Sequence, residues 1–201
     1  MEQEISISKK YTEGVSFYDA LKLAEGKRLI SNAQADRILQ DKDIRDKFSD
    51  LFPCWTGTVV IYEEAGKPFG EYVKNDYFVF DVPKQFQGLK DVCLVAEHPH
   101  YKIEEGKYGL RFLRVADEAN IRQQEFPKEY GWYLPDEVTG IPRSDKKDSS
   151  DSKARKLWRS VGAWIGPLVR YYYNFYGRRL VYAVGGPDDR LGVGLWSHRP
   201  N

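Results

Sequence analysis

The first part of the chain has a pattern of apolar and polar positions that predicts a short strand and then a capped helix. Ile5 and Ile7 alternate with serines, which is the period of a strand. Ser16 and Asp19 have the spacing of a capping box at a helix start. The apolar positions that follow have helical spacing and are Phe17, Ala20, Leu21 and Ala24. Gly26 favours the end of this helix.

A second helix is predicted directly after the first. Ser31 and Gln34 repeat the capping pattern. The apolar stripe behind this cap comprises Ala35, Ile38 and Leu39. We expect a further helical turn or two over Asp43–Leu51, and Pro53 ends the helical region.

The middle of the chain changes to strand-like patterns that are rich in β-branched and aromatic residues. The segments predicted as strands are Trp55–Tyr62, Tyr77–Val82 and Val92–Ala96. Residues 111–129 have no clear period and are interpreted as mixed structure. Arg143–Lys153 contains no apolar residue, so we expect a solvated loop there.

The last quarter of the chain, from Leu157 to Trp196, reads as strand segments. Glycine and proline residues are expected to interrupt them at Gly162, Gly166-Pro167, Gly177 and Gly185-Gly186-Pro187. No internal repeat is visible, and 201 residues fit one domain. We therefore expect a single domain over 1–201, with a scaffold over 1–156 and a separate functional region over 157–201.

Composition narrows the class of protein. The hydrophobic content of 41% is enough for a core, and a net charge of +1 gives no general attraction to nucleic acid or anionic membranes. No apolar run has the length of a membrane span, so we expect no membrane insertion. The N-terminus lacks the apolar segment of a secretory signal, so a cytoplasmic location is the default, with virion or surface display left open. Cys54 and Cys93 are interpreted as two buried thiols, with a single bridge as the alternative.

The order of these elements resembles a known fold. Residues 17–31 read FYDALKLAEGKRLIS, and a strand that opens with Trp55-Thr56-Gly57-Thr58 follows the second helix. This order resembles the first half of a C-type-lectin-like domain. Residues 168–180, LVRYYYNFYGRRL, and the later Gly192-Val193-Gly194 resemble the end of that fold in the variable proteins of diversity-generating retroelements, in particular their archaeal branch. The resemblance covers residues 1–60 and 157–201 and does not extend to the middle of the chain.

The resemblance implies an α+β, C-type-lectin-like fold with two helices on the N-terminal side and short, irregular antiparallel strands. It also implies a hypervariable C-terminal region in which adenines, chiefly of asparagine codons, are changed. Such changes yield Tyr, Asp or Ser but never Trp, so Trp158, Trp164 and Trp196 are expected to be fixed scaffold residues. The positions that would vary and bind ligand are Tyr171, Tyr172, Tyr173, Asn174, Tyr176, Tyr182, Asp188 and Asp189.

The aromatic content of the same region supports a binding role independently. Neighbouring residues in a strand alternate between faces, so Tyr171, Tyr172 and Tyr173 cannot all enter one core. Exposed tyrosine suits recognition, because it offers a large apolar surface, a hydroxyl group and few torsions to freeze. The alternative is that these aromatics fill a β-rich core.

Catalytic and metal-binding chemistry finds little support in the sequence. His98 and His100 flank a proline, and an exposed turn explains them more simply than a metal site. No zinc-protease, nucleophile-elbow or phosphate-loop motif occurs, and the calcium-site motifs of sugar-binding lectins are missing. Formylglycine-generating enzymes, which share the fold, use cysteines in their C-terminal part, and none follows Cys93 here. We expect no enzyme activity, no cofactor, no metal and no calcium-dependent sugar binding.

These observations lead to one main hypothesis and two alternatives. The main one is a binding protein that presents an aromatic-rich, hypervariable surface to a protein or another macromolecule. The first alternative is a structural or assembly protein of a virus or mobile element, with the aromatics at a subunit contact. The second is a nucleic-acid-binding protein, and the basic residues that would serve it are Lys153, Arg155, Lys156, Arg159, Arg178 and Arg179.

Overall fold

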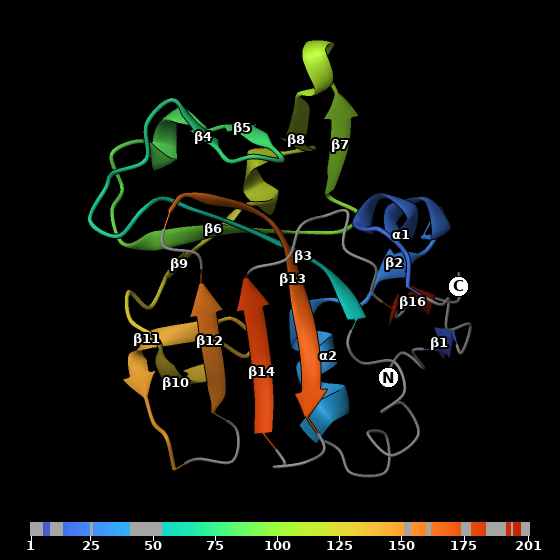
Figure 1. Ribbon diagram of the computed structural model, residues 1–201, viewed down its shortest axis with the longest axis vertical. Helices are drawn as coiled ribbons and strands as arrows, with labels where there is room; N and C mark the ends of the chain where they lie inside the picture. Colours follow the sequence, from blue (N-terminus) through green and yellow to red (C-terminus); the bar gives the residue numbers. More distant parts are fainter. Residues whose placement is uncertain are drawn as a thin grey trace.

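The computed structural model describes residues 6–8, 14–24, 26–40, 54–150, 154–159, 162–173, 178–183, 192–193 and 195–197 (Figure 1). These residues form a mixed α+β structure in which most strands pair antiparallel, which confirms the coarse fold class. The described α-helices are α1, Phe17–Leu23, and α2, Asn32–Gln40. Among the described residues, three strand pairs are parallel: β12 with β14, β15 with β3, and β5 with β8.

A nine-stranded sheet forms the centre of the molecule. Eight of its strands follow the order β11-β10-β12-β14-β13-β3-β6-β9, and β15 pairs with β3 off this path. The bounds of these strands are β3 Cys54–Tyr62, β6 Val92–Glu97, β9 Arg122–Glu125, β10 Gly131–Pro135, β11 Pro142–Lys147, β12 Arg155–Arg159, β13 Trp164–Tyr173, β14 Arg178–Ala183 and β15 Gly192–Val193.

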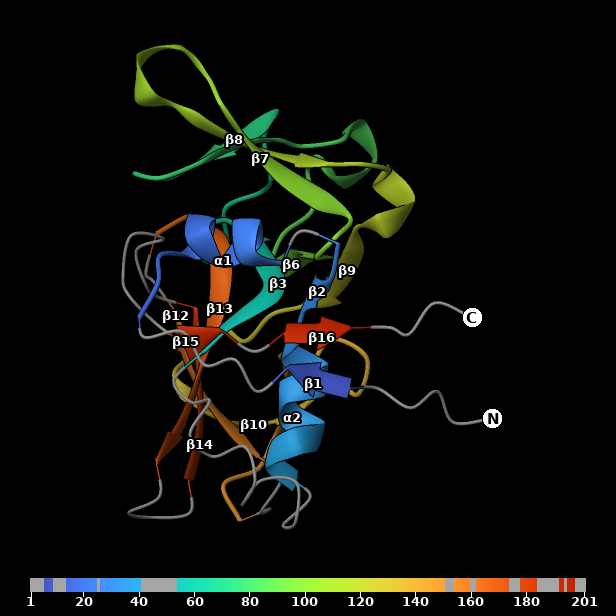
Figure 2. The same ribbon diagram turned by 90° about the vertical axis from the view of Figure 1, so that its right-hand side faces the viewer.

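Two smaller sheets complete the fold. The four-stranded sheet has the order β4-β5-β8-β7, and its strands are β4 Tyr72–Lys74, β5 Val79–Asp81, β7 Tyr101–Glu105 and β8 Arg111–Val115. The three-stranded sheet has the order β1-β16-β2, and its strands are β1 Ser6–Ser8, β2 Arg28–Leu29 and β16 Leu195–Ser197. The second of these brings strands from both ends of the chain side by side (Figure 2).

One face of the central sheet is covered by α1 and the four-stranded sheet. The side chains of Trp55, Val59 and Ile61 alternate along β3 and share one core with Phe17 and Ala20 of α1. The Phe17 and Trp55 rings lie 5.5 Å apart between centroids. Leu21 is half-buried against the same core. The predicted packing of this helix against the Trp-led strand is therefore confirmed, and we call this side the α1 face.

The opposite face of the sheet carries α2. Val60 and Tyr62 of β3 point to this side and share a second core with Cys93 and Trp164. At the start of α2, the backbone N–H of Asn32 donates to the Thr58 hydroxyl oxygen at 2.8 Å. Figure 2 shows α2 on one side of the lower part of the sheet, and the strands that it contacts most are β13 and β3. We call this side the α2 face.

Local signals at the helix starts are confirmed. Ser16 is the N-cap of α1, and its hydroxyl oxygen accepts the backbone N–H of Asp19. Ser31 and Gln34 form a reciprocal capping box, because each side chain accepts the backbone N–H of the other residue. Gly26 follows α1 with a φ of 73°, a left-handed conformation that glycine adopts easily.

Two expectations about irregular structure are wrong. Residues 142–147 are strand β11, not a loop, because they pair with β10 at the border of the central sheet. Gly166-Pro167 does not interrupt a strand: β13 runs through both residues, with a register shift against β3 between Pro167 and Val169. Residues 148–150 are irregular, as expected of a loop. Residues 151–153 lie outside the described residues, as does the helical turn expected over Asp43–Leu51.

Both cysteines, Cys54 and Cys93, are buried thiols rather than a disulfide, as predicted. None of the described helices combines the length and the apolar character needed to cross a membrane.

Candidate ligand-binding surface

The register of β12, β13 and β14 places three of the expected binding residues on one face of the sheet. Tyr171 pairs with Leu180 and Tyr173 with Arg178, and directly opposed residues share a face. Tyr182 pairs with Val169, which lies two residues before Tyr171 and so on the same face of β13 as Tyr171 and Tyr173. The positions of Tyr171, Tyr173 and Tyr182 therefore share one face of the sheet.

Tyr172 is separated from these three residues. It pairs with Arg179, and its neighbour Arg170 pairs with Val181. These positions alternate with those of Tyr171 and Tyr173, so they belong to the opposite face. Asn174, Tyr176, Asp188 and Asp189 lie outside the described residues.

Two contacts identify which face carries which tyrosines. Val169 is the register partner of Trp55, whose side chain packs on α1, so Tyr171, Tyr173 and Tyr182 occupy α1-face positions. On the other side, Leu157 of β12 pairs with Val181, and Arg155, two residues before Leu157, lies on the same face as this pair. Arg155 Nε lies 2.6 Å from Oδ1 of Asp36 in α2, so this is the α2 face. Tyr172 therefore occupies an α2-face position.

The α1 face is covered unevenly. Helix α1 and the four-stranded sheet lie over the β3–β6 part of the sheet. In the part of the chain that the structure describes, no helix or strand lies over the α1 face of β12 and β14 (Figure 1). Trp158 adds a further aromatic position there, because it is the register partner of Tyr182. We define the β12–β14–β13 ladder surface as these α1-face positions: Trp158, Tyr171, Tyr173 and Tyr182.

The tryptophans expected to be scaffold residues have different positions. Trp164 is buried in the core of the α2 face, as expected of a fixed residue. Trp196 is a register position of β16, opposite Ile7 and Arg28. Trp158 lies on the ladder surface, among the tyrosines.

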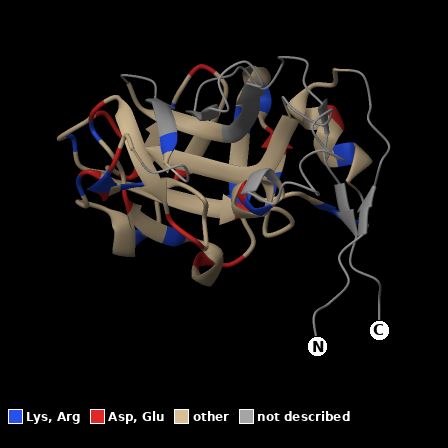
Figure 3. Ribbon diagram, turned by 90° about the horizontal axis from the view of Figure 1, so that it is seen from below, with Lys and Arg blue, Asp and Glu red and all other residues tan. Residues whose placement is uncertain are grey.

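The basic residues do not form one surface. The Arg155 side chain is fully buried and paired with Asp36, so it is removed from any nucleic-acid contact. Arg178 and Arg179 occupy opposite faces of β14. Figure 3 shows Lys and Arg interspersed with Asp and Glu over the described residues. These features give the nucleic-acid alternative no support.

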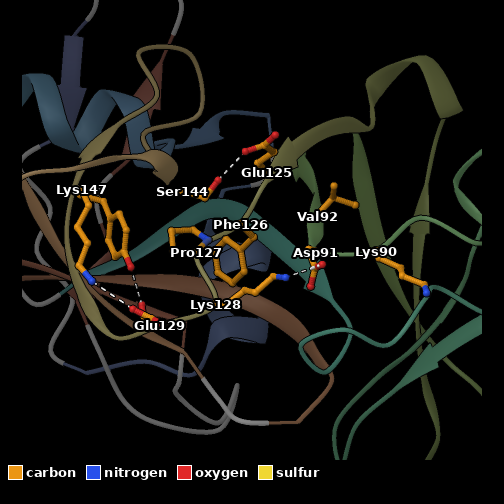
Figure 4. Close-up of a pocket in the computed structure, with 11 residues that line it drawn as sticks. Lys90, Asp91, Val92, Glu125, Phe126, Pro127, Lys128, Glu129, Ser144 and Lys147 are labelled. Atoms are coloured by element: carbon orange, nitrogen blue, oxygen red, sulfur yellow. Dashed lines mark hydrogen bonds and ion pairs between the residues drawn. The ribbon is translucent and has the colours of Figure 1, made fainter.

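A charged cavity of about 500 Å³ lies beside β9 and β10 (Figure 4). Lys128 Nζ lies 2.7 Å from Oδ2 of Asp91, and Lys147 Nζ lies 3.2 Å from Oε2 of Glu129. The Lys128 contact, with the backbone N–H of Gly66, lowers the pKa of the Asp91 carboxyl. With Lys90 and Glu125, three lysines and three carboxylates line the cavity, so it presents no excess of either charge to a ligand.

A second hollow, of about 550 Å³, lies between α1 and β7. Its apolar and aromatic walls come from Tyr18, Leu21, Tyr101 and Ile103, and its remaining lining residues are Lys22, His98, Lys102 and Glu105. We call it the α1–β7 groove. The sequence analysis assigned none of its lining residues to a ligand-binding site, although the alternation of Tyr101 and Ile103 on an otherwise charged strand was a visible signal.

His98, which lines this groove, is a structural residue. Its Nδ1 accepts the backbone N–H of Leu29 at 3.3 Å, so the neutral ring carries its proton on Nε2. Burial, with the charges of Arg28 and His100, lowers the pKa of His98 below its ordinary 6.5. His98 is half-buried within the turn, whereas Pro99 and His100 are exposed there, as expected. Within the described ranges, no cluster of three or more His, Cys, Asp and Glu residues could hold a metal ion.

No family model, curated protein or solved structure matches the chain.

Proposed function

We propose that the protein binds a macromolecular partner through the β12–β14–β13 ladder surface and that it acts as a binding protein rather than an enzyme. The observation that supports this most directly is the register, which gathers the positions of Tyr171, Tyr173 and Tyr182 on the α1 face beside β12 and β14, where no described helix or strand covers the sheet. A group of tyrosines on a rigid sheet provides a large contact area at low conformational cost.

The finer identification, also a proposal, is a C-type-lectin-like variable protein of a diversity-generating retroelement. It is supported by the order of a strand, two capped helices and a Trp-led strand, and by the sequence of residues 168–180. The test is the DNA that flanks the gene. We expect a reverse transcriptase gene and a near-copy of codons 157–201 that differs mainly at adenines, and a flanking sequence without either would contradict this identification.

Hydroxyl-radical footprinting with mass spectrometry tests the surface directly. We expect Tyr171, Tyr173 and Tyr182 to be oxidised at rates close to that of Tyr108, which is 98% exposed. Tyr62 and Tyr133 are buried and serve as the slow references. Slow oxidation of all three ladder tyrosines in a monomeric sample would show that they are covered, and the proposal would lose its basis.

A variant then separates binding from folding. Changing Tyr171, Tyr173, Tyr176 and Tyr182 together to Ser should leave cooperative unfolding intact and move the melting temperature by only a few degrees, because exposed substitutions cost about 0.5 kcal/mol or less each. The control Tyr62→Ser removes a buried aromatic and should cost about 3–5 kcal/mol. Collapse of the quadruple variant would assign these tyrosines to the core.

Sedimentation of the same variant addresses the assembly alternative. If the ladder surface is a contact between copies of this chain, the unchanged protein is an oligomer and the quadruple variant dissociates. We expect the same sedimentation behaviour for both proteins.

A further inference from the structure

Strand β7 is the border strand of the four-stranded sheet. The sheet order β4-β5-β8-β7 gives it one neighbour, β8, and the two strands pair without a register shift. Figures 1 and 2 show the β7–β8 hairpin extending beyond the central sheet, above α1. One side of β7 therefore has no strand next to it among the described residues, and such a border strand is a template for pairing with another chain.

The hydrogen-bond pattern identifies which backbone groups of β7 point to that free side. His100 O and Gly106 N are both bonded on the β8 side, at 2.8 and 2.7 Å from their partners. Because bonded residues alternate in an antiparallel pair, the groups that point away from β8 are those of Tyr101, Ile103 and Glu105. None of these three makes a backbone hydrogen bond to a described residue beyond the β7–β8 pair.

Antiparallel pairing of β7 with β7 of a second copy is restricted to a few registers. Outward-pointing residues must lie opposite each other, so a twofold axis that keeps most of the strand paired passes through Lys102, Ile103 or Glu104. An axis at Lys102 places two lysines directly opposite each other, and an axis at Glu104 does the same with two glutamates, which is destabilising. An axis at Ile103 instead places Lys102 of each copy opposite Glu104 of the other. The charges of β7 therefore fit a second copy of this chain in one register.

The same register satisfies the free backbone groups and keeps the charges balanced. Ile103 lies opposite Ile103, and Tyr101 lies opposite Glu105, so each outward N–H has a C=O across the axis. Lys102 Nζ already lies 2.5 Å from Oε1 of Glu104 in its own strand, and the second copy adds an opposite charge to each on the facing strand. Exposed ion pairs contribute little to affinity. They select the register, while the backbone hydrogen bonds and apolar contacts hold the two copies together.

The tip of the hairpin provides a further contact in this register. Tyr108 is 98% exposed, and its φ of 61° is a left-handed conformation that glycine, asparagine or aspartate adopts more readily, so the turn itself does not require an aromatic residue. Glu105 lies opposite Tyr101 of the second copy, so the tip beyond Glu105 continues past that tyrosine toward His98. Tyr101 and His98 both line the α1–β7 groove. An exposed tyrosine of each copy therefore reaches an apolar-walled hollow of about 550 Å³ in the other.

We propose that the protein forms a dimer through β7, with a twofold axis at Ile103, in which the two four-stranded sheets join into one continuous sheet and the Tyr108 tip of each hairpin enters the α1–β7 groove of the other copy. This interface is separate from the ladder surface and does not depend on the function proposed for it.

Sedimentation velocity with charge-swapped variants tests the dimer and its register. We expect the unchanged protein to shift from the mass of one chain to that of two as its concentration rises. Lys102→Glu and Glu104→Lys each place like charges opposite one another across the axis, so each variant alone should dimerise about tenfold more weakly. In an equimolar mixture of the two variants, opposite charges face each other again, and the mixed dimer should form nearly as the unchanged dimer does. A folding defect in either variant would not be rescued by mixing.

The matched control is Lys74→Glu. Lys74 is an exposed lysine on β4, the strand at the other border of the same sheet, so this variant makes the same change of charge away from the axis. It should dimerise as the unchanged protein does.

Tyr108→Asn separates the contact of the tip from folding. Asparagine suits a left-handed backbone, so the melting temperature of the dilute monomer should stay the same or rise. The dimer should be weakened about fivefold or more, as expected for an aromatic residue that enters a pocket of its partner. Radical oxidation of Tyr108 in the unchanged protein should be fast in the monomer and slower in the dimer.

Hydrogen exchange locates the interface on the backbone. Dimer formation should slow amide exchange at Tyr101, Ile103 and Glu105, whereas Lys102 and Glu104, already bonded to β8, should change little.

Five results would overturn the proposal. They are a monomer at every concentration, a dimer that neither charge reversal weakens, an equimolar mixture of the two variants that stays monomeric, dissociation by Lys74→Glu, and amide protection confined to β13 and β14. The fourth result would place the contact at the opposite border of the sheet, and the fifth would place it on the ladder surface. An unchanged dimer of Tyr108→Asn would remove the tip from the interface and contradict that part of the proposal.

Discussion

At the scale of single residues, close backbone contacts around Gly57, which we call the β2–β3 junction, hold β2 against β3. Gly57 N donates to Ile30 O at 2.7 Å, and His98 N donates to Gly57 O at 2.8 Å. A Cβ at position 57 would lie 2.9 Å from Cβ of Leu29, so only glycine fits there. The His98 ring closes the junction by accepting the N–H of Leu29. This last bond exists only while Nδ1 is unprotonated, which connects the junction to pH.

The stability of the protein should therefore depend on the charge of His98. Its folded pKa is lowered, so the unfolded chain takes up the proton first as pH falls below about 6.5. The stability that the neutral ring contributes is present above that pH and is lost between about 6.5 and the lowered folded pKa. Replacing His98 by Asn keeps an acceptor for Leu29 and removes the titration.

Urea unfolding between about pH 7.5 and 5 measures this effect. We expect the unchanged protein to lose more stability on acidification than His98→Asn does. The neighbouring Glu97 has a raised pKa, caused mainly by burial, so it acts in the opposite direction and becomes destabilising as pH rises through that pKa. Because Glu97 is present in both proteins, comparing them at each pH isolates the contribution of His98, and parallel pH curves would exclude it.

At the scale of elements, the two helices are specified locally. Capping residues satisfy backbone N–H groups that have no partner inside the helix. In α2, Ser31 Oγ accepts the N–H of Gln34, and Gln34 Oε1 accepts the N–H of Ser31 at 2.8 Å. Both contacts lie within one turn of the chain, so the sequence alone was enough to predict them.

Ser31→Ala should lower the free energy of unfolding by about 1 kcal/mol and the melting temperature by about 2–4 °C. The loss arises because the N–H of Gln34 is left without its acceptor. Arg37→Ala, an exposed change on the same helix, is the control and should change stability by less than about 0.5 kcal/mol. Differential scanning calorimetry distinguishes the two, and equal effects would mean that the cap contributes nothing measurable.

At the scale of the whole molecule, a buried ion pair joins parts of the chain that are far apart in sequence. Arg155 of β12 and Asp36 of α2 are 119 positions apart, and both side chains are almost inaccessible to solvent. Removing two charges from water is costly, and the attraction between them does little more than offset that loss of hydration. The pair fixes how α2 lies on the sheet more than it adds to stability.

A double-mutant cycle tests this interpretation. Arg155→Met alone leaves the Asp36 carboxylate buried without its cation and should cost about 3–5 kcal/mol. The double change Arg155→Met with Asp36→Leu removes both charges and should recover most of that loss. Urea denaturation gives the four free energies. A double variant as unstable as the sum of the single variants would show that the two residues do not interact.

The amino-acid sequence by itself determined the parts of this protein that depend on near neighbours. The helix caps at Ser16 and Ser31, the buried face of α1 and the strand that begins near Trp55 all follow from spacing within a few residues. Hydrogen bonds over three positions and side-chain period act locally, so their signals can be read directly.

Only the tertiary structure decided which segments pair. The largely charged segment 142–147 forms β11 because its backbone pairs with that of β10. A border strand with little burial carries no apolar pattern that would have predicted it. Pairing with β14 separates Tyr172 from Tyr171 and Tyr173, and the topology leaves one side of β7 without a strand among the described residues, next to α1. Each outcome depends on which strands pair and in what register, and the spacing of residues within one segment does not specify either.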